Sequence, residues 1–159
     1  MKRPEQILIN LLKEKELTIA FAESMSCGLA THKLGTVSGT SEIVMGSIIC
    51  YNENVKTTLL KVNKKLIDQY TAESQEVTNE LAKNLSKAIK ADVHAAITGL
   101  ASAGGSETKN KPVGTVFFAI SIKEKIYSRK RYFYGSPLEI KQKACKELYL
   151  FIIEKIKKQ

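Results

Sequence analysis

Along the chain, short uninterrupted apolar runs alternate with stretches whose apolar residues recur every three or four positions. Apolar runs between polar turns are typical of buried strands, and the longer spacing is typical of amphipathic helices. The pattern predicts strands at residues 17–22, 43–51, 93–97, 114–122 and 126–134. It predicts helices at 4–14, from 29 to about 37, at 54–60, near 66, from an N-cap at Ser74 to about 90, and from 137 to about 156.

This succession indicates an α/β fold. Helices interleave with buried strands, and the last two strands form a hairpin around 123–125. The expected architecture is therefore a three-layer α/β/α sandwich with a mixed sheet. A chain of 159 residues suits one compact domain, so we expect a single domain over residues 1–159.

Several classes of protein are not expected. No apolar run approaches the roughly 18 residues that span a bilayer, and the chain start lacks a secretory apolar region, so the expected location is the cytoplasm. Three cysteines, Cys27, Cys50 and Cys145, form no CxxC pair, and the two histidines, His32 and His94, do not suffice for a zinc centre. Neither a disulfide scaffold nor a metal site is expected.

The charge leaves more than one partner open. Lys and Arg number 25 against 16 Asp and Glu, giving a formal net charge of +9. Such a field attracts anions, whether nucleic acid, an acidic surface or a phosphorylated metabolite. The lysines are spread along the chain, which favours an ordinary solvated surface. Aromatic and basic residues at 127–134 could suit single-stranded nucleic acid, but alternation within a strand explains them more simply.

Three polar segments follow three predicted strands: 23–28, 51–56 and 98–106. In open α/β sheets, ligands and reactive groups collect at the carboxyl ends of the strands. We therefore expect these segments to converge on one edge of the sheet.

Ser24 is the candidate nucleophile in the first segment. A serine hydroxyl needs a base within hydrogen-bond reach, and neither histidine stands in a partner segment. A lysine with a lowered pKa can serve instead, which favours Lys56. If Met25 and Ser26 begin a helix, their free N–H groups could hold an oxyanion. The plainer alternative is that Ser24 only caps the following helix.

Two neighbouring features stay open. Glu23 is interpreted as a surface charge, a structural partner of Lys56 or a ligand of a substrate amide. The run Gly104–Gly105–Ser106 allows N–H groups to approach an anion such as phosphate, but a merely flexible loop has the same composition.

Taken in order, these motifs resemble a known family. They are Ala22-Glu23-Ser24 with Gly28, the Tyr51 to Lys56 spacing, Ser74-Gln75-Glu76-Val77, Thr98-Gly99-Leu100-Ala101 with Gly104-Gly105-Ser106, and Lys111-Pro112-Val113-Gly114-Thr115-Val116. The chain resembles the CinA C-terminal domain, whose stand-alone members are nicotinamide-nucleotide amidases. The resemblance is collinear from about residue 5 to 156.

The resemblance implies hydrolysis of nicotinamide mononucleotide (NMN) to nicotinic acid mononucleotide and ammonia, without cofactor or metal. It implies Ser24 as nucleophile, Lys56 as its partner in a Ser-Lys dyad and Tyr51 as an aid to proton transfer. The residues expected at the substrate are Glu23, Met25, Ser26, Thr98, Gly99, Gly104, Gly105 and Ser106. Family members commonly form homodimers.

The chain departs from the family pattern at three places. Cys27 stands where a glycine is usual, so its side chain is expected to narrow the pocket. The middle of the 51–56 segment differs, and the loop at 99–105 is shorter and lacks proline. These departures leave the alternative of a catalytically weak nucleotide-binding module of the same fold. The net charge of +9 and the family's link to DNA uptake leave a second alternative, a nucleic-acid-associated competence/damage-inducible protein.

Overall fold

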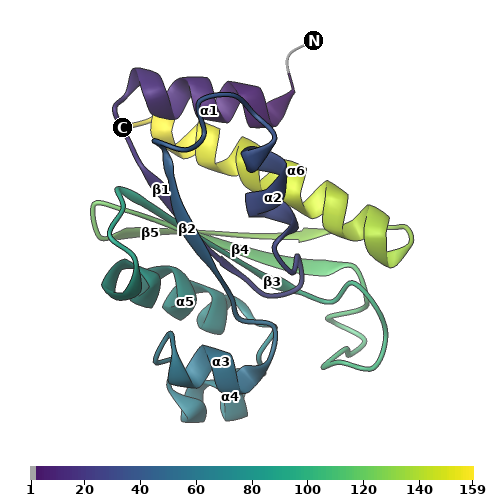
Figure 1. The fold of residues 1–159 in the computed structure, drawn as a ribbon. Coiled ribbons are helices and arrows are strands. Elements are labelled where there is room, and N and C mark those ends of the chain that lie inside the picture. Colours follow the sequence, from purple (N-terminus) through teal and green to yellow (C-terminus); the bar gives the residue numbers. More distant parts are fainter. Residues whose placement is uncertain (1–2) are drawn as a thin grey trace.

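A five-stranded sheet forms the middle layer of the protein (Figure 1). In the computed structural model, which describes residues 3–159, its strands are β1 (Ile19–Glu23), β2 (Val44–Ile49), β3 (Val93–Gly99), β4 (Thr115–Ile122) and β5 (Lys125–Tyr132). The order across the sheet is β2-β1-β3-β4-β5. Strand β1 is parallel to both β2 and β3, whereas β3–β4 and β4–β5 are antiparallel pairs. The predicted mixed sheet is confirmed.

Helices cover both faces of this sheet (Figure 1). One face carries α1 (Pro4–Glu14), α2 (Leu29–Gly35) and α6 (Pro137–Lys157). The other carries α5 (Gln75–Ala88), with the short helices α3 (Glu53–Thr58) and α4 (Lys64–Tyr70) beside it. The α/β fold with three layers is therefore as predicted.

The alternation of side chains along the central strands builds two cores. In β1, Phe21 packs into the core beneath α1 and α6, whereas its neighbours Ala20 and Ala22 face the core beneath α5. Every residue of β1, β3 and β4 is buried, because helices cover both faces of these strands. Burial of this apolar surface is the main stabilising contribution, at roughly 25 cal/mol per Å².

Element boundaries shift by a few residues from the predicted ranges, and the end of β3 matters for the site. Strand β3 runs two residues beyond 97 and includes Thr98 and Gly99. A Cβ atom at Gly99 would lie 2.6 Å from the carbonyl oxygen of Thr115, so only glycine fits against β4 there. Helix α2 begins at Leu29 as predicted, and residues 24–28 form a turn, so no helix begins at Met25 or Ser26.

The parallel strands β2, β1 and β3 end at the same edge of the sheet, which places the segments that follow them next to one another. Among residues 3–159, no helix combines the length and apolar character needed to cross a membrane.

Candidate active site

A cavity of about 250 Å³ opens at this edge of the sheet. It lies where the chain leaves β1, β2 and β3, so the expected convergence of the three polar segments is found. Its lining residues are Ser24, Met25, Tyr51, Glu73, Gly99, Leu100, Ala101, Ser102, Ala103, Gly104, Gly105, Pro137 and Lys141.

The side chains of Ser24 and Lys56 meet beside this cavity. The Nζ atom of Lys56 lies 3.0 Å from the Oγ atom of Ser24, 2.5 Å from the carbonyl oxygen of Cys50 and 3.2 Å from that of Tyr51. Lys56 is fully buried, and Ser24 is 4% exposed. The amine therefore has three neutral oxygen partners and no carboxylate within salt-bridge distance among residues 3–159.

Backbone hydrogen bonds of the sheet hold this pair in place. The N–H of Ser24 donates to the carbonyl of Ile97 at the end of β3. The N–H of Cys50, just beyond β2, donates to the carbonyl of Glu23. The carbonyl of Cys50 in turn accepts from Lys56, so the ends of three strands fix both members of the pair.

Burial lowers the pKa of Lys56 below its ordinary value of 10.5. The nearby groups Cys50, Glu73 and Glu53 act in the opposite direction, but burial is the largest cause. A lysine that loses its proton at lower pH is a better general base near neutrality.

Within the part of the chain that the structure describes, the turn after β1 leaves the backbone N–H groups of the two residues that follow Ser24 without an acceptor. The N–H of Cys27 donates to the carbonyl of Ser24 and closes the turn. Among residues 3–159, the N–H groups of Met25 and Ser26 have no hydrogen-bond acceptor and are available to an oxyanion, although no helix begins at these residues. Ser24 is not a helix cap either, because the N-cap residue of α2 is Gly28.

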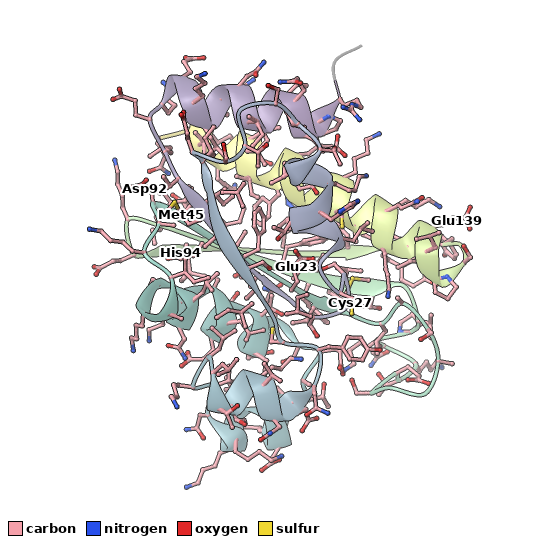
Figure 2. The ribbon with its side chains drawn as sticks, viewed as in Figure 1. Glu23, Cys27, Met45, Asp92, His94 and Glu139 are labelled. Carbon is pink, nitrogen blue, oxygen red and sulfur yellow. The ribbon has the colours of Figure 1, made fainter. Side chains whose placement is uncertain are left out.

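Glu23 is neither a surface charge nor a partner of Lys56. Its carboxylate is fully buried and does not line the cavity. It accepts hydrogen bonds from the hydroxyls of Ser26 and Thr31 and from the N–H groups of Gly28, Ala30 and Thr31, at 2.6–3.0 Å. Figure 2 shows it enclosed between the sheet and α2. Glu23 thus ties the turn that carries Ser24 to the start of α2.

Two other expected residues make different contacts from those the sequence suggested. Tyr51 lines the cavity but is 65% exposed, and within residues 3–159 its hydroxyl makes no hydrogen bond; its backbone carbonyl is what reaches Lys56. Thr98 is fully buried and pairs with the hydroxyl of Thr78 at 2.8 Å, behind the cavity wall.

The glycine loop is already occupied by a side chain of this protein. Gly104 and Gly105 line the cavity, but their N–H groups donate to the carboxylate of Glu107 at 2.7 and 2.8 Å. These backbone hydrogen bonds lower the pKa of Glu107. The Ser106 hydroxyl lies between Glu73 and Lys111 and does not line the cavity. The anion nest expected at 104–106 is therefore formed, but Glu107 fills it.

Cys27 does not narrow the cavity as was expected. Its side chain is exposed and is absent from the cavity wall. Its backbone has φ 55°, a left-handed conformation that costs a side-chain-bearing residue more than it costs glycine. A glycine at this position would therefore serve the turn rather than the approach of a ligand.

Sequence reasoning did not find three of the lining residues: Glu73, Pro137 and Lys141. Glu73 precedes the N-cap of α5, and Lys141 is one of several lysines on α6, so no local pattern distinguishes either from a surface residue. Their place at the cavity follows only from the packing of α5 and α6 on opposite faces of the sheet.

Neither histidine contacts Ser24. His32 lies exposed on α2, and His94 lies near the start of β3, where its Nε2 atom pairs with the carbonyl of Ile89. Figure 2 shows His94 and Asp92 at the opposite end of the sheet from Glu23. Within the described residues, no group of three His, Cys, Asp or Glu side chains is placed to hold a metal ion.

Comparison with known proteins identifies what this chain is similar to. The model of the CinA C-terminal domain family matches residues 1–156. A CinA-like protein of Pseudothermotoga lettingae is 37% identical over 152 residues, which cover 95% of this chain and 37% of that protein. The chain thus spans little more than a third of the length of the curated relatives it matches.

Solved structures agree. The competence-damaged protein (CinA) superfamily protein from Escherichia coli has a TM-score of 0.89 and 26% identity, covering 94% of this chain and 87% of that one. The corresponding superfamily protein from Klebsiella pneumoniae 700603 has a TM-score of 0.92 at 22% identity, covering 98% and 97%, and supports the fold alone.

Proposed function

The chain belongs to the CinA C-terminal domain family, and we therefore propose that it is an amidohydrolase with Ser24 as nucleophile and Lys56 as general base. The observation that carries the proposal is the 3.0 Å contact between the buried amine of Lys56 and the hydroxyl of Ser24. A weak nucleophile beside a base of lowered pKa is the arrangement that acyl transfer needs.

The contacts of Lys56 explain how it acts as a base. A neutral amine has two N–H donors and one lone pair. The carbonyls of Cys50 and Tyr51 accept the two N–H groups, which leaves the lone pair directed at Ser24. After Lys56 takes the serine proton, all three hydrogens of the ammonium still have acceptors, so proton transfer requires no rearrangement.

The rest of the reaction follows from the same groups. Ser24 Oγ attacks the carboxamide carbon, and the free N–H groups of Met25 and Ser26 stabilise the oxyanion. Lys56 returns its proton to the departing ammonia. Water then attacks the acyl-enzyme with Lys56 again as base, releasing the carboxylic acid and restoring Ser24.

For the substrate we propose the carboxamide of NMN, as the resemblance to nicotinamide-nucleotide amidases implies. The products are nicotinic acid mononucleotide and ammonia. The cavity wall carries one basic side chain among the described residues, Lys141, which supplies a cation for the substrate phosphate because Glu107 already holds the glycine N–H groups.

The test is ammonia release from NMN by the purified chain, with the Ser24→Ala variant beside it. A matched control is Ser38→Ala, which removes an exposed serine outside the cavity. We expect release by the unmodified chain and by Ser38→Ala and none by Ser24→Ala, together with a nicotinoyl ester on Ser24 that mass spectrometry detects.

Absence of release above the Ser24→Ala background would refute the amidase proposal. Calorimetric binding of NMN without release would instead favour the nucleotide-binding module of the same fold. Ser102 and Ala103 belong to the loop at 99–105 that departs from the family pattern, and they lie on the cavity wall. They are therefore the residues to exchange in that case.

A further inference from the structure

One carboxylate on the cavity wall has no part in the proposed chemistry. Among the described lining residues, Glu73 is the single acid and Lys141 the single base. Glu73 lies between α4 and α5, next to Ser74, the N-cap residue of α5. Its charge is close enough to oppose the lowering of the pKa of Lys56, so it lies within electrostatic reach of the catalytic pair.

Ser106 and Lys111 hold Glu73 in place, and the Lys111 ammonium attracts its carboxylate without forming a salt bridge with it. The hydroxyl of Ser106 donates to its Oε2 atom at 2.5 Å. The nearby ammonium of Lys111 donates to the backbone carbonyl of Glu73, to the hydroxyl of Thr71 and to the hydroxyl of Ser106. These three contacts use all three hydrogens of that ammonium.

Glu73 itself forms no salt bridge with any of residues 3–159. Lys111 reaches the carboxylate only through Ser106, so among the described residues the Glu73 side chain has no direct ionic partner and favours a cationic ligand group in the cavity. Lys141 reaches the cavity from α6, which covers the other face of the sheet from α5, and favours an anionic group. The cavity therefore suits a ligand that carries both a positive and a negative charge.

We propose that Glu73 is a specificity-determining residue that selects the positively charged pyridinium ring of an N-ribosylated nicotinamide over a neutral ring. The inference rests on the proposed function for the identity of the substrate. The pyridinium charge is permanent, because the ring nitrogen is bonded to ribose and carries no proton to lose. A carboxylate and a cation within a shared cavity attract by an amount that corresponds to a tenfold to hundredfold preference, allowing for screening by water.

The experiment compares two ligands that differ chiefly in ring charge. NMN carries the cationic ring, whereas its reduced form has a neutral dihydropyridine ring and keeps the carboxamide, ribose and phosphate. The ratio of kcat/KM for the two ligands is measured in the unmodified chain and in Glu73→Gln. Glu73→Gln keeps the size of the side chain and an oxygen acceptor for Ser106.

Comparing ratios removes two other effects. The intrinsic reactivities of the two amides cancel between variants, and any change in the basicity of Lys56 acts on both ligands alike. The matched control is Glu76→Gln, which makes the same charge change three residues away on an exposed side chain outside the cavity. We expect the ratio to fall about tenfold or more in Glu73→Gln and to stay unchanged in Glu76→Gln.

A binding measurement separates this inference from the amidase proposal. Calorimetry in a Ser24→Ala background gives the affinities of both ligands without turnover. If Ser24→Ala prefers the cationic ring and Ser24→Ala/Glu73→Gln does not, the role of Glu73 stands whether or not ammonia is released. If Glu73→Gln lowers the affinity for both ligands by the same factor, or changes neither, the role is refuted even when hydrolysis is observed.

Discussion

The side-chain amine of Lys56 lies 3.0 Å from the hydroxyl oxygen of Ser24, although 32 positions separate the two residues. Both residues are buried, and the other hydrogen-bond partners of the amine are two backbone carbonyls rather than a carboxylate. A buried lysine without an ion pair favours its neutral form. The burial that keeps this amine from water therefore favours the neutral form, which can accept a proton.

The pH dependence of the rate should report Lys56. Its neutral form is the base, so kcat/KM should rise with pH and level off above the folded pKa, which lies below 10.5 because of burial. Lys56→Met, of similar volume, should lower the rate by at least ~100-fold and abolish this rise. Near-normal turnover in Lys56→Met would remove Lys56 from the mechanism.

Stability should follow the same titration. Between the folded and unfolded pKa of Lys56, the unfolded chain binds the extra proton, so the free energy of unfolding rises with pH. The contribution is fully present above the unfolded value and is lost as pH falls through the folded value. Denaturant unfolding across this range should show a smaller slope against pH for Lys56→Met than for the unmodified chain.

Glu23→Gln should destabilise the protein and slow it. Glutamine offers one acceptor oxygen where the carboxylate offers two, so an amide NH₂ group must face donors such as the N–H of Ala30 or of Thr31. We expect a loss of about 2–4 kcal/mol in the free energy of unfolding. We also expect a fall in kcat, because the turn bearing Ser24 loosens.

Denaturant unfolding and kcat check this expectation together. Glu42→Gln, at an exposed position, is the control and should change neither quantity. Unaltered stability in Glu23→Gln would mean that the buried contacts of Glu23 contribute little.

Cys27→Gly should stabilise the protein by up to about 1 kcal/mol and leave kcat/KM unchanged. Glycine relieves the left-handed backbone at φ 55°, and the side chain that it removes does not line the cavity. Cys27→Ala removes the thiol but keeps the backbone cost, so it should show no gain. A rise in kcat/KM for Cys27→Gly would instead support a steric role for Cys27 at the substrate.

Glu107→Ala should tighten the binding of a phosphorylated substrate. It releases the N–H groups of Gly104 and Gly105 and removes a negative charge beside the cavity. We expect the KM for NMN to fall several-fold and that for nicotinamide riboside, which lacks the phosphate, to stay unchanged. Glu124→Ala is the control at a distant exposed carboxylate. An equal rise in both KM values would show that Glu107 only holds the loop in shape.

The layers of the fold could be predicted because the pattern of apolar residues in each element reflects which of its faces are buried. The run at 17–22 is apolar since β1 is buried on both faces, and Leu81 and Leu85 recur at helical spacing since α5 covers one of those faces. The ends of helices and strands depend more on contacts with other parts of the chain. Strand β3 extends through Gly99 only because β4 passes close beside it, a contact that the local sequence does not contain.

The candidate nucleophile and base could also be named from the sequence, because both follow apolar strands and carry suitable side chains. Their contact could not be derived, since it depends on the order of β2, β1 and β3 across the sheet. The resemblance to the CinA C-terminal domain implies the same pair, Ser24 and Lys56, from sequence alone.

The roles of three glutamates could not be determined from the sequence by itself. Residue type determined only that Glu23, Glu73 and Glu107 each carry a carboxylate near a polar segment. Tertiary structure decided their roles. Glu23 accepts hydrogen bonds that hold a turn, Glu73 lines the cavity, and Glu107 accepts hydrogen bonds from the N–H groups of Gly104 and Gly105. A carboxylate acts according to the donors and charges around it, and folding brings those groups from distant parts of the chain.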